Sequence, residues 1–259
     1  MNPMLLRSQS FQQVQSFPLA RISTYQPTKQ GSVFFPLNAA SLAELKKFFA
    51  VVASERRFQL EELSQVSALA GLPLQFATIG LKLDRFGNEL MNETQAGILL
   101  AKKLSPVISV GIELNYFVRA FQTLHKQSAI TAGLGMTFHL SDQFVTGVHI
   151  YNPTKVQVTE TGERLPYRYS MGLGYAPSEK FFLVTDLQKI EDQPVNIHTG
   201  VHYCIVPRVS VSMGITSAAS SFYAAISYRF HKLMITGSAA MHPYLGWSPG
   251  LMLAYNEEK

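Results

Sequence analysis

Apolar and polar residues alternate along this chain from Lys46 onward, and turn residues interrupt the alternation about every ten positions. Between positions 108 and 116 the apolar residues are Ile, Val, Ile, Leu and Tyr, and the residues between them are Ser, Gly, Glu and Asn. Successive side chains of a β-strand point to opposite faces, so this segment has one apolar and one polar face. Repetition of such segments is typical of a transmembrane β-barrel, whose outer face meets lipid.

The alternation predicts fourteen strands, and therefore an all-β fold. Tight turns, such as the one at Ser105-Pro106, alternate with longer loops, such as the one at 153–166, as they do at the two rims of an outer-membrane barrel. We therefore predict a transmembrane antiparallel β-barrel of about fourteen strands. The expected strands are 46–54, 64–72, 74–85, 91–104, 107–121, 128–140, 143–152, 167–176, 180–189, 195–205, 208–217, 220–230, 233–242 and 246–256.

Residues 1–45 differ from the rest of the chain because they have no sustained period and contain Pro18, Pro27 and Pro36. We expect them to form a plug-like N-terminal segment in or under the lumen, and residues 46–259 to form the barrel. An apolar stretch typical of a secretory signal is not visible at the N-terminus.

The alternation also predicts which face of each strand is inside the barrel. Charged side chains facing lipid near the bilayer centre cost roughly 2–4 kcal/mol, so the polar face should line the lumen. A slip of one residue would move Glu113 and Arg168 into lipid, which fixes the register. The expected lumen-lining residues are Lys82, Asp84, Glu93, Glu113, Arg168, Asp186, His198, His202, Arg208 and Arg229. They could line an ion pathway or pair across the interior and hold it together.

Composition supports this class and excludes others. The chain is 47% hydrophobic but only 15% charged, against about 25% charged residues in soluble domains. It has no run of ~20 apolar residues, which argues against transmembrane helices. The single cysteine excludes an internal disulfide. The net charge is +5, but the basic residues are scattered, which argues against nucleic acid as a partner.

No motif for catalysis or metal binding emerges from the sequence. His198 and His202 are four positions apart in one strand, or ~13 Å, and no third or fourth ligand is placed to join them. The nucleophile motif G-x-S-x-G is missing. Glycines at alternate positions, as in Gly172-Leu-Gly174, fit a tight inner wall rather than a phosphate loop. We therefore predict a non-catalytic barrel without metal or cofactor. An outer-membrane barrel hydrolase and a soluble all-β domain are the less favoured alternatives.

Three stretches resemble the PorV/PorQ family of Bacteroidota outer-membrane proteins, relatives of the FadL-like fatty-acid channels. They are GSVFFPLNAASL at 31–42, RFGNELMNET at 85–94, and YAPSEKFFLVTD at 175–186 followed by HPYLG at 242–246. The first departs from the family's Asn-Pro-Ala-Gly-Leu segment because Pro36 precedes Asn38. The chain also ends in Asn-Glu-Glu-Lys rather than on the aromatic residue common in such barrels.

The resemblance implies a FadL-like fourteen-stranded barrel in the bacterial outer membrane. It implies a transport role or a docking scaffold in type IX secretion, with outer-membrane lipid and other secretion or envelope proteins as partners. The alternative that it leaves open is a FadL-like channel for hydrophobic small molecules.

Overall fold

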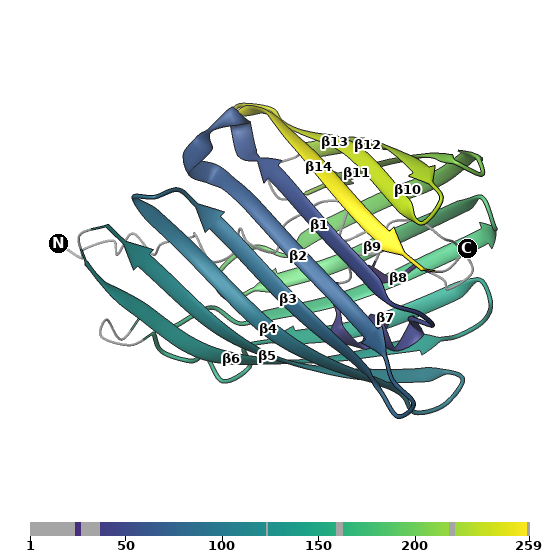
Figure 1. Cartoon of the computed structure of the whole chain (residues 1–259), viewed down its shortest axis with the longest axis horizontal. Coiled ribbons are helices and arrows are strands. Elements are labelled where there is room, and N and C mark those ends of the chain that lie inside the picture. The colour runs from purple at the N-terminus through teal and green to yellow at the C-terminus, as the bar shows by residue number, and fades with distance from the viewer. Residues whose placement is uncertain (1–23, 27–36, 123, 159–162, 218–220, 258–259) are drawn as a thin grey trace.

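A computed structural model describes residues 24–26, 37–122, 124–158, 163–217 and 221–257. Its strands form one closed antiparallel barrel, in which each strand pairs with its neighbours in sequence and the last pairs with the first (Figure 1). The predicted fold class is confirmed. The strands are β1 (Phe49–Arg56), β2 (Ser64–Pro73), β3 (Thr78–Gly87), β4 (Met91–Lys103), β5 (Ile108–Phe121), β6 (Leu124–His139), β7 (Phe144–Tyr151), β8 (Arg168–Ser178), β9 (Phe181–Ile190), β10 (Asn196–Val206), β11 (Val209–Thr216), β12 (Ser221–Phe230), β13 (Leu233–His242) and β14 (Gly246–Asn256).

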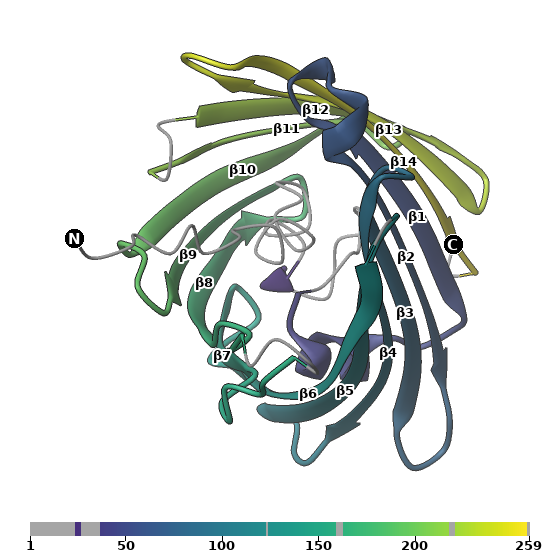
Figure 2. The ribbon, with the colours of Figure 1, turned by 90° about the vertical axis from the view of Figure 1, so that its left-hand side faces the viewer.

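The helices of the described residues include three short 3₁₀ segments, η2 (Ala39–Glu44), η3 (Arg57–Gln59) and η4 (Glu61–Leu63). None of the helices in the described ranges is long and apolar enough to cross a bilayer. Figure 2 looks into the barrel and shows η2, in purple, inside the ring of strands.

The barrel has two unlike rims. The rim with short turns, here called the short-turn rim, includes the connections 104–107, between β4 and β5, and 179–180, between β8 and β9. The opposite rim, here called the loop rim, includes the connections 57–63 and 152–167. β6 begins at Leu124, so the loop predicted over 122–127 is too long: Phe121 of β5 already pairs with Leu124. The alternation of apolar and polar residues predicts which face a side chain is on, but it does not predict where the pairing of two strands ends.

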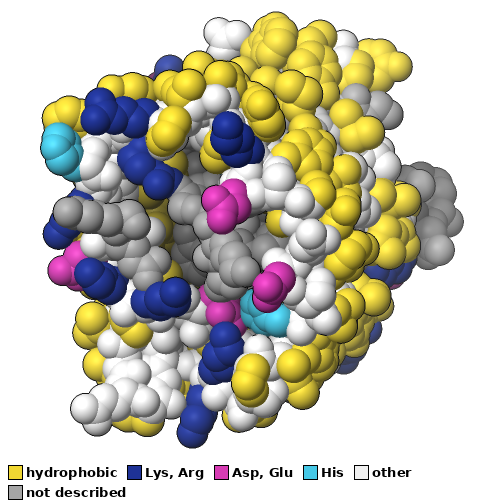
Figure 3. Space-filling model, turned by 90° about the vertical axis from the view of Figure 1, so that its right-hand side faces the viewer, with side chains coloured by type: hydrophobic (Ala, Val, Ile, Leu, Met, Phe, Trp, Pro, Cys, Tyr) yellow, Lys and Arg dark blue, Asp and Glu magenta, His cyan; other side chains and the backbone are white. Residues whose placement is uncertain are grey.

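The register puts apolar side chains outside. Ile112 of β5 pairs with Leu134 of β6, and about half of each of these side chains is exposed, while Glu113 in the next position is buried. Hydrophobic side chains cover the flank of the molecule, and charged side chains gather around one end (Figure 3). Such an apolar flank is the surface that lipid solvates in a transmembrane barrel.

A charge introduced on this flank tests the predicted lipid contact. Leu114 is exposed in the middle of β5, and Leu104 is equally exposed in the turn that follows β4. Arginine on the lipid face costs roughly 2–4 kcal/mol at the bilayer midplane and about 0–1 kcal/mol near the interface. Leu114→Arg should therefore lower the free energy of unfolding from lipid vesicles by that larger amount, and Leu104→Arg should leave it nearly unchanged. Equal effects in urea titrations would contradict a bilayer around the flank.

Candidate functional site: the interior of the barrel

Several glycines line one side of the barrel interior. At seven of these glycines, here called the glycine wall, an added side chain would collide with the N-terminal segment or with a neighbouring strand. A Cβ atom at Gly111 would lie 2.3 Å from the backbone nitrogen of Ala40, and one at Gly172 would lie 2.0 Å from Cε2 of Tyr25. The glycine wall consists of Gly71, Gly80, Gly111, Gly135, Gly147, Gly172 and Gly174. It therefore provides the space in which the described part of residues 1–45 lies.

Asn38 binds the N-terminal segment to β6 and β7. Its side-chain oxygen accepts a hydrogen bond from the backbone N–H of Ala40 (3.0 Å), which caps η2. Its side-chain nitrogen donates to the backbone carbonyls of Met136 (3.2 Å) and Val148 (3.1 Å), on β6 and β7. Because the Asn38 side chain is fully buried, each of these bonds replaces one that water would otherwise make.

Glu44, at the end of η2, is held by three strands. Lys103 Nζ of β4 lies 3.0 Å from one carboxylate oxygen, and Ser109 Oγ of β5 donates to the other (3.1 Å). His139 Nε2 of β6 lies 3.7 Å from it. The described part of the N-terminal segment is thus bound to the strands of the barrel at both ends of η2. Glu44 is not among the predicted interior residues, because it lies outside the alternating strands.

The strands β3 to β8 carry a second group of interior side chains, mostly charged. Lys82 Nζ lies 3.1 Å from Asp84, and His149 Nε2 lies 3.4 Å from Glu113, which itself lies over Gly133. Arg168 lies over the ring of Tyr151, with 5.2 Å between its Cζ and the ring centroid. All of these side chains are buried. The predicted residues Lys82, Asp84, Glu113 and Arg168 therefore come together on one wall, here called the polar wall.

Nearer the loop rim, Glu93 is held by a residue that the sequence analysis did not identify. Arg119 Nε donates to Glu93 (2.7 Å), and Arg119 Nη1 donates to Glu163 (2.8 Å), which belongs to the β7–β8 loop. Arg119 has the same parity on β5 as Glu113, and this parity could have identified it as an interior residue.

Three other predicted lumen residues, Asp186, His198 and His202, lie on β9 and β10. His198 Nδ1 lies 3.6 Å from Asp186, and its Nε2 is hydrogen-bonded to the hydroxyl of Tyr223 (2.9 Å). His202 Nδ1 is hydrogen-bonded to Ser212 Oγ (2.8 Å), and Phe182 stacks on its ring. Among the described residues, no three His, Cys, Asp or Glu side chains are placed to hold a metal ion.

Two predicted residues lie at the end of the barrel rather than deep inside it. Arg208 is exposed in the turn between β10 and β11, and Arg229 is partly buried at the end of β12, with its backbone N–H bonded to the carbonyl of Arg208. Arg208 has the parity of the inward Ser210 and Ser212, but the strand begins only at Val209. An odd or even position predicts the inner or outer face only for residues that lie within a strand.

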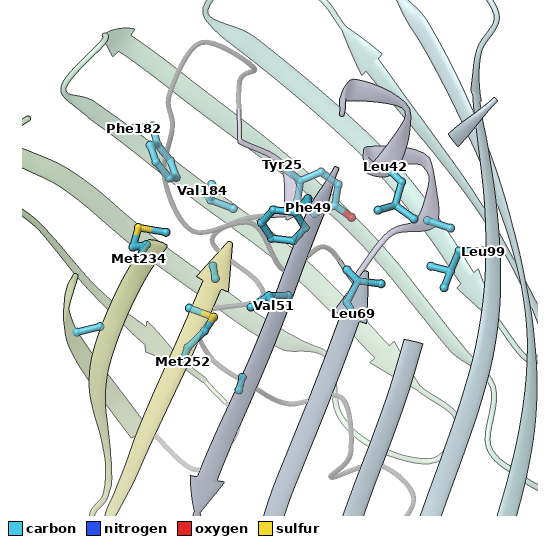
Figure 4. Close-up of a cluster of buried hydrophobic side chains, with 14 of the residues drawn as sticks. Tyr25, Leu42, Phe49, Val51, Leu69, Leu99, Phe182, Val184, Met234 and Met252 are labelled. Carbon is cyan, nitrogen blue, oxygen red and sulfur yellow. The ribbon is translucent and has the colours of Figure 1, made fainter. Parts of the chain in front are cut away.

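A further part of the interior surface is apolar, and we call it the apolar wall. Figure 4 shows its side chains together with Tyr25 and Leu42 of the N-terminal segment, which point toward it. The sequence gives one indication of this apolar wall, because residues 49–53 of β1 are apolar on both faces of the strand. The apolar wall includes Phe49 and Val51 of β1, Leu69 of β2, Phe182 and Val184 of β9, Met234 of β13 and Met252 of β14.

The loop between β7 and β8 folds over the interior at the loop rim. Its Val158 and Leu165 are buried against Phe117 and Tyr151 of the strands. Asn152 holds the loop's shape by donating to the carbonyl of Leu165 (2.7 Å).

An ion pair at the base of this loop joins it to the next loop of the rim. Lys155 Nζ lies 3.0 Å from Glu191, and this hydrogen bond raises the pKa of Lys155. The ammonium also lies 4.5 Å from the ring centroid of Tyr167. The pair is exposed, so its contribution to stability is small.

The barrel resembles known channels in fold. No family model and no curated protein matches this chain. The solved structure titled CymD monoaromatic hydrocarbon channel matches with a TM-score of 0.67 and 10% identity over 86% of this chain and 92% of that one. The Pseudomonas putida toluene transporter TodX matches with 0.61 and 8% over 91% and 95%, and a Pseudomonas aeruginosa FadL homologue with 0.61 and 9% over 85% and 92%. At these identities the likeness is one of fold.

The glycine wall predicts how firmly the N-terminal segment is held. At Gly172 a methyl group would meet the Tyr25 ring, whereas a methyl group at Gly237 would meet no atom within 4 Å. Overpacking costs about 1–3 kcal/mol, and about 1.4 kcal/mol is a factor of ten. Gly172→Ala should therefore speed tryptic release of peptides preceding Lys46 by about tenfold, and Gly237→Ala should not. Equal release from both variants, measured by mass spectrometry, would contradict the close packing of Tyr25 against Gly172.

Proposed function

We propose that this chain is a non-catalytic barrel of the bacterial outer membrane through which hydrophobic small molecules pass. The observation that carries the proposal is the apolar wall inside the barrel. Interiors of transmembrane barrels that conduct water are polar, yet here Phe49, Val51, Phe182, Met234 and Met252 turn inward and form one buried cluster.

The chemistry of that wall suits a hydrophobic passenger. Methionine side chains are flexible and polarizable, so Met234 and Met252 can adapt to ligands of different outline. Tyr25 and Leu42 of the N-terminal segment now cover part of the wall. We therefore propose that residues 1–45 act as a plug and that passage requires this segment to give way.

The fold comparison supports the same role. The matched structures include a monoaromatic hydrocarbon channel and a toluene transporter. A docking scaffold for type IX secretion, implied by the PorV/PorQ resemblance, is the second hypothesis. Passage is favoured because the apolar wall faces the interior, where a partner protein bound outside would not use it.

A bulky side chain on the apolar wall should obstruct passage. Met234 faces inward and is nearly fully buried, while its neighbour Ile235 faces outward and is half exposed. In cells that carry the protein in the outer membrane, Met234→Trp should slow initial uptake of toluene by about tenfold, as a barrier of about 1.4 kcal/mol would. Ile235→Trp adds the same volume on the lipid face and should leave uptake unchanged.

A long-chain fatty acid serves as the second probe in the same assay. Parent cells that take up neither probe faster than cells without the protein would overturn the proposed passage. Uptake slowed equally by Met234→Trp and Ile235→Trp would show that the route does not follow the apolar wall.

A further inference from the structure

Basic side chains gather at the short-turn rim, on the side of the barrel formed by β8 to β14 and the start of β1. They occupy four adjacent connections of that rim, namely the lead into β1 and the turns β8–β9, β10–β11 and β12–β13. Figure 3 looks at this end of the molecule, where β14 finishes, and shows dark blue Lys and Arg side chains on several sides of it. We call the set the basic arc, and it consists of the exposed residues Lys46, Lys47, Lys180, Arg208 and Lys232.

The backbone holds three of these residues at equivalent positions. The carbonyl of Lys180 accepts a hydrogen bond from the N–H of Cys204 on β10 (2.8 Å), and the carbonyl of Arg208 accepts one from Arg229 on β12 (2.8 Å). The carbonyl of Lys232 accepts one from the last residue of β14 (2.8 Å). Each turn is thus bonded to the strand that follows its hairpin, and because neighbouring strands lie about 4.8 Å apart, successive turns are roughly 10 Å apart along the rim.

The basic arc has few counter-charges. The carboxylates of Glu179 and Glu257 belong to the same part of the rim, but no carboxylate of the described residues forms an ion pair with a member of the arc. On the loop rim, by contrast, Lys155 is bound to Glu191. The described connections of the loop rim contain more acidic than basic residues, whereas those of the short-turn rim contain more basic ones. The arc is therefore a surface of net positive charge.

Large apolar side chains lie beside these cations on the outside of the barrel. Phe48 follows Lys47 and lies next to Tyr255 of β14, with 6.2 Å between the ring centroids. Phe230 and Leu233, on either side of the β12–β13 turn, are about half exposed. At a membrane surface, apolar side chains of this kind meet the acyl chains while Lys and Arg reach the headgroups. The basic arc therefore lies where the apolar flank ends.

We propose that the basic arc binds the phosphate groups of anionic phospholipids in the leaflet that surrounds the short-turn rim. A lipid phosphate can accept hydrogen bonds from a lysine ammonium and two parallel ones from a guanidinium such as that of Arg208. A lipid also covers the apolar side chains beside the arc, whereas an acidic protein docked on the end of the barrel would leave them uncovered. The inference depends on the proposed membrane location but not on the passage of hydrophobic molecules.

Quenching of tryptophan fluorescence by brominated lipids tests this binding. The chain has one tryptophan, Trp247, which faces outward near the loop rim. Leu233→Trp combined with Trp247→Phe places the reporter beside Lys232 instead. The full-length proteins are folded into phosphatidylcholine vesicles that contain brominated phosphatidylglycerol or, at the same mole fraction, brominated phosphatidylcholine. The reporter at 233 should show phosphatidylglycerol favoured about fivefold, which corresponds to about 1 kcal/mol, the attraction of one cation to an anionic surface. The reporter at 247 should show a ratio near one.

Removing the charge of the arc should remove the preference. Lys232→Gln together with Arg208→Gln should bring the ratio at the 233 reporter close to one. So should 1 M KCl, because the screening length is then about 3 Å. Lys126→Gln, which removes an exposed cation at the start of β6 near the loop rim, should leave the ratio unchanged.

Heat-modifiable migration in gels identifies the variants that form the closed barrel, and the salt titration tests the arc without the double substitution. Equal quenching by both lipids at the 233 reporter would overturn the proposal, and so would the same preference at Trp247 or a preference that survives the loss of both charges. Loss of the preference in inorganic phosphate, but not in KCl of equal ionic strength, would show a site for the free anion instead. Lack of quenching at both reporters would overturn the membrane location itself, whereas a failure of toluene uptake alone would overturn only the proposed passage.

Discussion

Every strand in this molecule depends on the requirement that backbone N–H and C=O groups be bonded to something. Lipid offers no hydrogen bonds, so a sheet that spans a bilayer must close on itself. The pairing of β1 with β14, which runs from Phe49 opposite Asn256 to Glu55 opposite Gly250, meets this requirement. Closure then divides the side chains into an outer set that meets lipid and an inner set enclosed by the wall, and the chemistry of the interior follows from this division.

The interior that results has three unlike parts. Glycines of β2 to β8 leave space for the N-terminal segment, and charged side chains of β3 to β8 pair beside it. Apolar side chains of β1, β2, β9, β13 and β14 form the third part. The barrel separates these parts by strand, so that a change at Met234 of β13 and a change at Glu113 of β5 affect different parts of the same lumen.

The sequence predicted the barrel and its facing because lipid and lumen impose opposite demands on neighbouring residues. Glu113 beside Ile112 and Leu114 leaves one register possible. Periodicity carries no information about where a ladder stops, and so β6 begins earlier than expected and Arg208 falls in a turn. Nor does it show which interior groups meet. The joining of Arg119 to Glu163 depends on how a loop folds, and the position of Asn38 depends on a segment without a period.

The glycine wall also bears on the order in which the protein is assembled. The glycines of this wall extend from Gly71 to Gly174. The surface on which Tyr25 and Ala40 pack is therefore complete only when strands distant in sequence have aligned. Contacts between remote parts of a chain form slowly, because the intervening loop must first be ordered. The N-terminal segment is synthesised before the strands and is therefore among the last parts of the fold to dock. A machinery that inserts this barrel must tolerate a free leading segment until β8 is in place.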